Sequence, residues 1–118
     1  MPSREEQIVA KLRQFCADMP EAEEGTLVHH VCWRRKGKPF VVVGDHGGLN
    51  LSVKVGKEMQ GVYLEDTRFY KTPYMGHHGW VSFKAADGKM PWPELKGLVV
   101  QSYELVAVTK KARKTTIK

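Results

Sequence analysis

The chain has 118 residues, a length that suits one domain and leaves no room for two. Its 42% hydrophobic and 27% charged residues are the ordinary balance of a globular protein with its own core. No apolar run is long enough to span a bilayer, and the N-terminus lacks the apolar core of a signal peptide. We therefore expect a cytoplasmic protein without membrane contact, and a monomer rather than an oligomer. Cys16 and Cys32 are expected to be buried free thiols, with a disulfide as the alternative.

The net charge of +6 is concentrated in the second half of the chain. Residues 67–118 contain 10 Lys or Arg against 3 Asp or Glu, whereas residues 1–66 are nearly balanced. A basic surplus favours polyanionic partners such as nucleic acids. Solubility alone is the other explanation for a charge of this size.

The first expected element is a helix that starts after Ser3. Ser3 and Glu6 have the spacing of a capping box, in which each side chain accepts from a backbone N–H of the other residue. Apolar residues then recur every three or four positions as far as Met19, which predicts one buried stripe. Pro20 ends the helix, because the residue before a proline is pushed out of the helical region. Residues 21–25 read as a polar connector.

Three strands are expected next, over residues 26–35, 39–44 and 49–55. Val, Leu and Trp dominate the first, a turn at residues 36–38 precedes the second, and a Gly-rich turn precedes the third. In the third strand apolar and polar residues alternate, which predicts one buried face and one face in contact with solvent. Together these strands form an antiparallel meander.

The second half of the chain is expected to be a short helix, a strand and a long helix. Residues 56–66 change to helical spacing, residues 67–79 look irregular, and residues 80–84 form a strand. Pro91 and Pro93 precede a second apolar stripe that runs from Leu95 to about Lys110. We expect one domain over residues 1–110 and a basic, flexible tail over residues 111–118.

These elements predict an α+β fold with a mostly antiparallel sheet. The N-terminal and C-terminal helices each have one apolar stripe, and both stripes can be buried if the two helices cover the same face of the sheet. The other face of the sheet is then expected to meet solvent.

Five short sequences in the same order make the chain resemble the MmcQ/YjbR-like family. The resemblance extends from about Arg4 to Arg113. The matching sequences are Pro20-Glu21-Ala22-Glu23-Glu24, Gly37-Lys38-Pro39-Phe40, Leu49-Asn50-Leu51-Ser52-Val53-Lys54, Pro73-Tyr74-Met75-Gly76-x-x-Gly79-Trp80-Val81 and Ser102-Tyr103-Glu104-Leu105-Val106.

The resemblance implies a frataxin-like (CyaY-like) α+β sandwich, in agreement with the pattern of elements. It also implies DNA binding, because members of the family are commonly described as DNA-binding proteins. Members often carry Lys or Arg just before the Gly-Trp or His-Trp sequence, where this chain has His77 and His78. These two residues titrate near neutral pH, so an anion contact at this position would depend on pH.

The first functional hypothesis is therefore a non-enzymatic DNA-binding domain without a cofactor. Four cations gather at the expected hairpin around residue 36, and a second set lies near the C-terminus. Contacts of this kind to phosphates are largely independent of DNA sequence and weaken with salt. The alternative is that a charged hairpin simply protects an exposed sheet edge. The candidate DNA-binding residues are Arg34, Arg35, Lys36, Lys38, Lys110, Lys111, Arg113 and Lys114.

The second hypothesis is a small-molecule or protein-interaction site in the loop that leads into the strand at residue 80. Tyr74, His77, His78 and Trp80 form the most unusual local cluster in the sequence, and such groups can stack on a ligand. The alternative is that Tyr74 and Trp80 pack against the sheet edge while the histidines face water.

Metal binding and catalysis are not expected. The His and Cys residues show no standard zinc spacing. The resemblance to frataxin-like folds raises iron binding through acids near the first helix, but basic residues interrupt those acids. No nucleophile motif, phosphate loop or dinucleotide motif is present. The residues weighed as metal ligands are His29, His30, Cys32, His46, His77 and His78, and the acids are Glu5, Glu6, Asp18, Glu21, Glu23 and Glu24.

Overall fold

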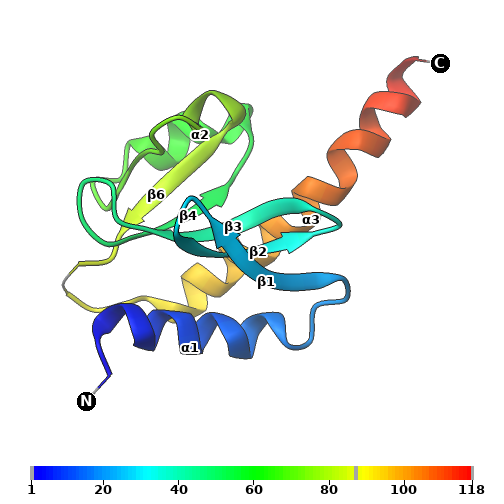
Figure 1. The fold of residues 1–118 in the computed structure, drawn as a ribbon. Coiled ribbons are helices and arrows are strands. Elements are labelled where there is room, and N and C mark those ends of the chain that lie inside the picture. Colours follow the sequence, from blue (N-terminus) through cyan, green and yellow to red (C-terminus); the bar gives the residue numbers. More distant parts are fainter. Residues whose placement is uncertain (1, 87, 118) are drawn as a thin grey trace.

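A computed structural model describes residues 2–86 and 88–117, with side chains as far as residue 107. It has the expected α+β fold (Figure 1). Six antiparallel strands form one sheet in the order β1-β2-β3-β4-β6-β5. The elements are α1 (Arg4–Cys16), β1 (Ala22–Leu27), β2 (His30–Arg35), β3 (Lys38–Gly44), β4 (Asn50–Lys54), α2 (Lys57–Leu64), β5 (Phe69–Lys71), the 3-10 helix η1 (Gly76–His78), β6 (Trp80–Lys84) and α3 (Trp92–Ile117).

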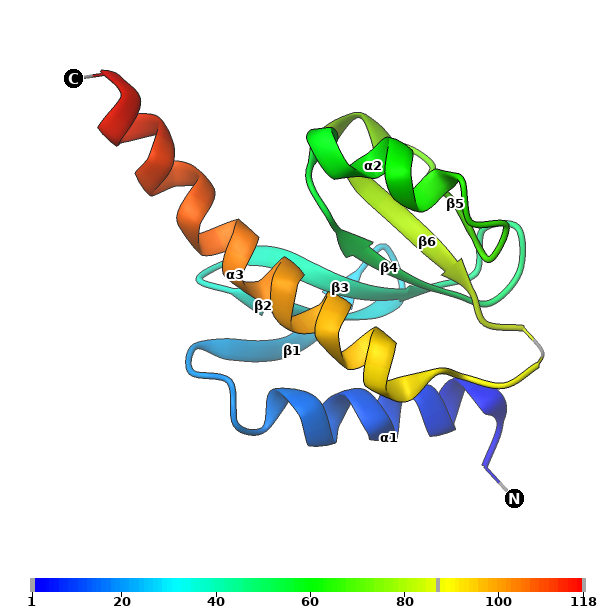
Figure 2. The same ribbon diagram turned by 180° about the vertical axis from the view of Figure 1, so that it is seen from behind.

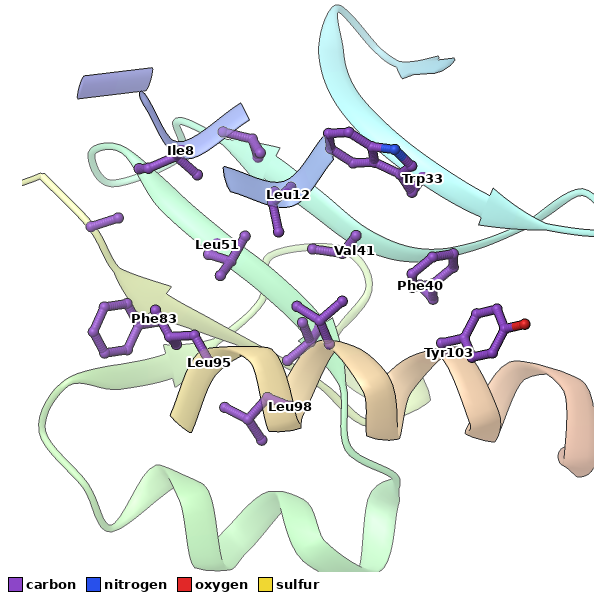
Figure 3. Packing of buried hydrophobic residues seen from close by; sticks show 14 of the residues in the cluster. Ile8, Leu12, Trp33, Phe40, Val41, Leu51, Phe83, Leu95, Leu98 and Tyr103 are labelled. Carbon is purple, nitrogen blue, oxygen red and sulfur yellow. The ribbon is translucent and has the colours of Figure 1, made fainter. Parts of the chain in front are cut away.

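The terminal helices cover the same face of the sheet, as the two apolar stripes predict. In Figure 2, α3 crosses in front of the central strands, α1 runs below β1 next to the start of α3, and α2 lies over β5 and β6. Ile8 and Leu12 of α1 and Leu95 of α3 are almost completely buried in one core, together with inward-facing residues of the strands (Figure 3). In β4, Leu51 belongs to this core, whereas its neighbours in the strand point to the opposite face.

The ends of α1 follow the local sequence closely. Ser3 Oγ accepts from Glu6 N at 3.1 Å, and Glu6 Oε1 accepts from Ser3 N at 2.8 Å, which confirms the capping box. The helix ends at Cys16, before Met19, and the chain turns so that Tyr103 on α3 donates its hydroxyl hydrogen bond to Pro20 O. This bond joins the segment between α1 and β1 to the middle of α3.

The first strand of the expected meander is in fact a hairpin. The segment expected as a connector, residues 21–25, lies mostly in β1, and residues 26–35 are divided between β1 and β2. Val28 and His29 form the two-residue turn with φ of 48° and 72°. Such a turn usually contains Gly, Asn or Asp, because those residues tolerate positive φ. Val and His gave no turn signal, so the sequence predicted one continuous strand.

Two further expectations differ from the structure. Phe69–Lys71 pairs with β6 as the edge strand β5, although residues 67–79 looked irregular. Helix α3 continues to Ile117 instead of ending near Lys110, because residues 109–117 contain neither Gly nor Pro to stop it. The flexibility of residues 111–118 stays a prediction. Within residues 2–86 and 88–117, no helix combines the length and apolar character needed to cross a membrane.

Candidate ligand cavity on the open face of the sheet

The face of the sheet opposite the helices contains a cavity of about 400 Å³. The hairpin between β1 and β2 forms one wall with Leu27 and Val28, and the loop before η1 forms another with Pro73 and Met75. Val42 of β3 contributes apolar surface between them. These two loops add walls to the sheet, which is why a face that was expected simply to meet solvent is hollow.

The floor of the cavity is a row of polar side chains from two neighbouring strands and the loop after β5. Asn50 and Ser52 come from β4, Ser82 from β6, and Thr72 follows β5. Ser52 Oγ lies 2.9 Å from Asn50 Oδ1 and 2.7 Å from Ser82 Oγ, and Ser82 Oγ lies 2.9 Å from Thr72 Oγ1. All four side chains are buried, with Ser82 at 0% exposure. The hydrogen bonds compensate for the loss of water around these groups.

Asn50 anchors one end of this row to the turn between β3 and β4. Its Nδ2 donates to His46 O at 3.2 Å and to Gly48 O at 3.1 Å. A side chain at Gly44 would place a Cβ 3.0 Å from Asn50 Oδ1, so the absence of a side chain there leaves room for the amide. The turn and the floor are therefore held as one unit.

Three aromatic rings close the end of the cavity next to this turn. The ring of His46 makes edge contacts with those of His30 and Tyr74, each with centroids 5.9 Å apart. His30 Nε2 lies 3.5 Å from a carboxylate oxygen of Asp45. Tyr74 is 84% exposed and stands at the rim. These rings give the cavity a surface on which a flat molecule can stack.

Tyr70 of β5 supports the same turn from the edge of the sheet. Its hydroxyl donates to His46 O at 2.6 Å. Burial raises the pKa of Tyr70, while the neighbouring side chains of Asn50 and Ser82 act in the opposite direction. The phenol therefore stays protonated at neutral pH and remains a donor to His46.

A second hollow, of about 450 Å³, lies next to this cavity. Leu27 and Met75 line both of them. Lys38, Lys54 and His78 line it, with Trp80 also in its wall. The pKa of His78 is lowered, first by the charge of His77, then by burial and by Lys54 and Lys57. This edge of the molecule is therefore electropositive, and its charges favour the neutral form of His78.

The cations of the hairpin at residue 36 are mostly engaged within the protein. Arg34 donates to Thr26 O at 2.8 Å. Arg35 lies 3.3 Å from Glu21, donates to Tyr103 O and places its guanidinium 4.0 Å from the centroid of the Tyr103 ring. Lys36 also pairs with Glu21, at 3.3 Å. Only Lys38 of the four faces a hollow. The side chains of the other DNA-binding candidates, Lys110, Lys111, Arg113 and Lys114, lie outside the described residues.

The aromatic and histidine cluster predicted around residue 77 does not converge on one site. Tyr74 lies at the rim of the polar-floored cavity, whereas His78 and the buried Trp80 line the second hollow. His77 stacks on His78 with ring centroids 3.9 Å apart and faces a further shallow hollow beside Tyr74. The structure therefore divides these four residues between neighbouring surfaces.

The candidate metal ligands are also separated. Among the side chains that the structure describes, no three His, Cys, Asp or Glu residues gather as a metal site requires. Cys16 and Cys32 are free and buried, as expected. Of the acids near the first helix, Glu24 forms a two-point ion pair with Arg13, and Glu21 pairs with Arg35 and Lys36. Glu6 is used in the helix cap.

The sequence reasoning missed the floor of the cavity. Asn50 and Ser52 alternate with apolar residues, a pattern that predicts a solvent-facing surface. Their burial depends on loops that are distant in the sequence, so the alternation alone gave no signal. The one available signal was chemical: β4 and β6 both carry a Ser in mid-strand, at positions that pair across the sheet as Ser52 and Ser82.

Comparisons with known proteins agree with this architecture. The crystal structure of Deinococcus radiodurans protein DR2400, which has a DUF419 domain, is similar in fold with a TM-score of 0.70 and 23% sequence identity. The similarity covers 88% of this chain and 80% of that one. No curated protein matches the chain. The YjbR family model matches residues 17–105, which include the whole sheet and most of the described part of α3, and the chain therefore belongs to the YjbR family.

Proposed function

We propose that this domain binds a small organic ligand in the cavity on the open face of the sheet. The observation that carries the proposal is the burial of a polar row, Asn50, Ser52, Thr72 and Ser82, beneath an apolar rim. A cavity of about 400 Å³ lies in the range of small-molecule sites, which combine apolar walls with a few fixed polar groups.

The rim supports the same proposal. Val28 and Tyr74 are 76% and 84% exposed, although both are large apolar or aromatic residues next to the opening. Both also have positive φ, of 48° and 67°, which is rare for residues other than glycine. Strained backbone and exposed apolar side chains that occur together are typical of binding sites.

The proposed role is binding without catalysis. The floor hydroxyls of Ser52, Ser82 and Thr72 are bonded to one another and to Asn50. A serine nucleophile instead needs a base, usually histidine, within hydrogen-bond distance. The arrangement of the floor therefore supports recognition of a ligand by hydrogen bonds.

The test is a fragment screen of the full chain by NMR, read from the backbone signals of residues 50–52 and 72–82. We expect several fragments to shift these signals. Tyr74→Ala should weaken their binding because it removes a ring from the rim, whereas Met59→Ala, another exposed apolar residue on α2, should leave it unchanged. A screen without hits in this region, or equal effects of the two variants, would contradict the proposal.

A second candidate function is the binding of nucleic acid at the electropositive edge. The specific observation is the grouping of the lysines Lys38 and Lys54 around the second hollow. The basic residues near the end of α3 belong to the same proposal. Phosphate contacts by such groups depend steeply on salt, because binding releases counterions. The engagement of Arg34 and Arg35 within the protein makes Lys38 the better residue to test.

The experiment measures the affinity for a labelled DNA duplex at several salt concentrations. Lys38→Glu should weaken binding and reduce its salt dependence, whereas Lys84→Glu, the same charge change at the far end of β6, should do neither. Replacing Lys110, Lys111, Arg113 and Lys114 with Ser tests the C-terminal segment in the same assay. No binding at about 50 mM salt, where such contacts are strong, would exclude this function.

A further inference from the structure

The direction of every hydrogen bond in the cavity floor follows from the available protons. Nδ2 of Asn50 lies next to two backbone carbonyl oxygens, His46 O and Gly48 O, which can only accept. The amide orientation is therefore fixed, and Oδ1 must face Ser52. Since Oδ1 can only accept, the proton of this bond comes from the Ser52 hydroxyl.

The same reasoning extends along the row. Ser52 has one hydroxyl proton and gives it to Asn50, so the proton between Ser52 and Ser82 belongs to Ser82. Ser82 has then used its own proton, so Thr72 donates to Ser82. The chain of donors runs from Thr72 through Ser82 and Ser52 to Asn50. All three hydroxyl protons of the floor are therefore consumed inside the floor.

What remains for a ligand is a set of acceptor lone pairs. A hydroxyl oxygen can accept two hydrogen bonds, and in this row Ser52 and Ser82 have each accepted one from the floor and Thr72 none. A ligand that offers only acceptors would face these lone pairs without a proton between them. Burying such unpaired polar groups is unfavourable, so the floor discriminates against that ligand.

The remaining lining defines the rest of the ligand. None of the described residues that line the cavity is Asp, Glu, Lys or Arg, so a charged molecule would lose its hydration without gaining a partner charge. The apolar walls and the rings of His46 and Tyr74 suit an aromatic body. His30 and His46 can each donate or accept, so they do not set the preference.

We infer that the cavity selects uncharged aromatic or heteroaromatic molecules that present N–H or O–H donors to the row formed by Thr72, Ser82 and Ser52. This inference rests on the proposed ligand-binding function and adds the chemical class of the ligand. The selection arises from Asn50, which fixes the direction of the whole row although it lies at one end.

The experiment compares matched pairs of probes that differ in one donor. Indole and phenol are measured against 1-methylindole and anisole, by NMR titration of the full chain at neutral pH. We expect the donor member of each pair to bind about fivefold or more tightly, the ratio that corresponds to one net hydrogen bond of about 1 kcal/mol. The shifted signals should include those of Ser52, Thr72 and Ser82.

The possible results distinguish between a wrong ligand class and the absence of ligand binding at the cavity. Equal affinities within the pairs, or tighter binding of the methylated members, would overturn the ligand class and leave the cavity as a binding site. If neither member of any pair shifts the floor signals, both the ligand class and the proposed function are contradicted.

Two variants test the direction of the row. Ser82→Ala removes the acceptor of Thr72, whose proton then becomes available to a ligand, so the preference for donor probes should fall towards a ratio of one. Thr72→Val has nearly the same shape and leaves the donation from Ser82 to Ser52 intact, so a clear preference for donors should persist. If Ser82→Ala keeps the affinity ratio between donor and methylated probes that the unchanged chain shows, the hydrogen bonds do not run from Thr72 to Asn50 as inferred.

Discussion

The hydroxyl of Ser102 on α3 donates a hydrogen bond of 2.6 Å to the carbonyl oxygen of Phe40 on β3. Ser102 Oγ in turn accepts a hydrogen bond of 2.9 Å from Lys54 N, at the end of β4. Ser102 is completely buried. A single side chain therefore connects the long helix to two neighbouring strands through their backbones, in addition to allowing close approach of the helix.

Ser102→Ala should destabilise the protein by about 1–3 kcal/mol, because a buried carbonyl and a partly buried N–H would lose their partner. Urea unfolding measures the change, with Gln101→Ala as a control at the preceding, partly exposed position of α3. A loss below about 0.5 kcal/mol, the size of an ordinary surface substitution, would show that the hydroxyl is not needed for docking of the helix.

Gly79 and Gly61 should respond in opposite directions to replacement by alanine. Gly79 has φ of 88°, and a Cβ there would lie 2.7 Å from backbone atoms of Gly56 and Lys57. Gly79→Ala should therefore destabilise by at least about 2 kcal/mol. A Cβ on Gly61, inside α2, meets no atom within 4 Å, so Gly61→Ala should stabilise by about 0.5–1 kcal/mol.

Thermal unfolding of both glycine variants provides the measurement. The Gly61 variant is the matched control, since it adds the same methyl group without a close contact. If Gly79→Ala unfolds at the same temperature as the unchanged chain, the backbone of Gly79, before β6, does not approach the backbone at the start of α2 this closely in solution.

Asp66 should titrate far below an ordinary aspartate. The Arg68 side chain and backbone N–H both donate to its carboxylate, and they lower its pKa from 3.8 to about 2. Because the pKa in the folded state is depressed, the stabilising contribution is present above about pH 4. It is lost as the pH falls towards 2. Carboxyl NMR signals followed between pH 1.5 and 6 measure the midpoint directly.

Arg68→Gln should raise the Asp66 midpoint towards 3.8, although part of the depression should remain because the backbone donor at position 68 is kept. Arg13→Gln is the reciprocal control, since Arg13 is the group that lowers the pKa of Glu24. A midpoint for Asp66 that is the same with and without the Arg68 side chain would show that the ion pair does not form.

Patterns within single elements allowed most of the fold to be predicted. The capping box at Ser3, the two helical stripes and the alternation in β4 each report a local preference that the tertiary structure keeps. The missed hairpin shows the limit of this reasoning, because Val28 and His29 take up a turn that their residue types do not favour. The pairing of β1 with β2 places the turn at these two residues, and a scale of single-residue propensities does not contain that pairing.

The candidate site was less accessible to prediction for a related reason. Tyr74 was predicted from its unusual neighbours, and it does lie at the cavity rim. Ser52, Thr72 and Ser82 look like solvated strand or loop residues in the sequence. Their role depends on hydrogen bonds between elements up to 30 residues apart. Similarly, Arg35 looked available to DNA because its partners, Glu21 and Tyr103, lie far away in the chain.

Cys16 and Cys32 should be almost unreactive in the folded protein. Burial, with a smaller contribution from the charge of Glu24, raises the pKa of Cys16 to about 11. Burial also raises the pKa of Cys32, against the opposing effect of Arg34. The thiolate is the reactive form, so both cysteines should react slowly with a disulfide reagent at pH 8 and at once when urea unfolds the chain.

Single replacements separate the two thiols. In Cys32→Ser, the rate of modification of Cys16 in the folded state should still increase between pH 9 and pH 11, where an exposed cysteine has already reached its limiting rate. Cys16→Ala reports on Cys32 in the same assay. Rapid modification of either thiol in the folded protein at pH 8 would mean that the face on which it lies opens readily. Cys32 lies on β2, in the sheet beside the candidate cavity. Opening there would imply that the cavity wall is mobile and that its hydrogen-bonded floor is not rigid.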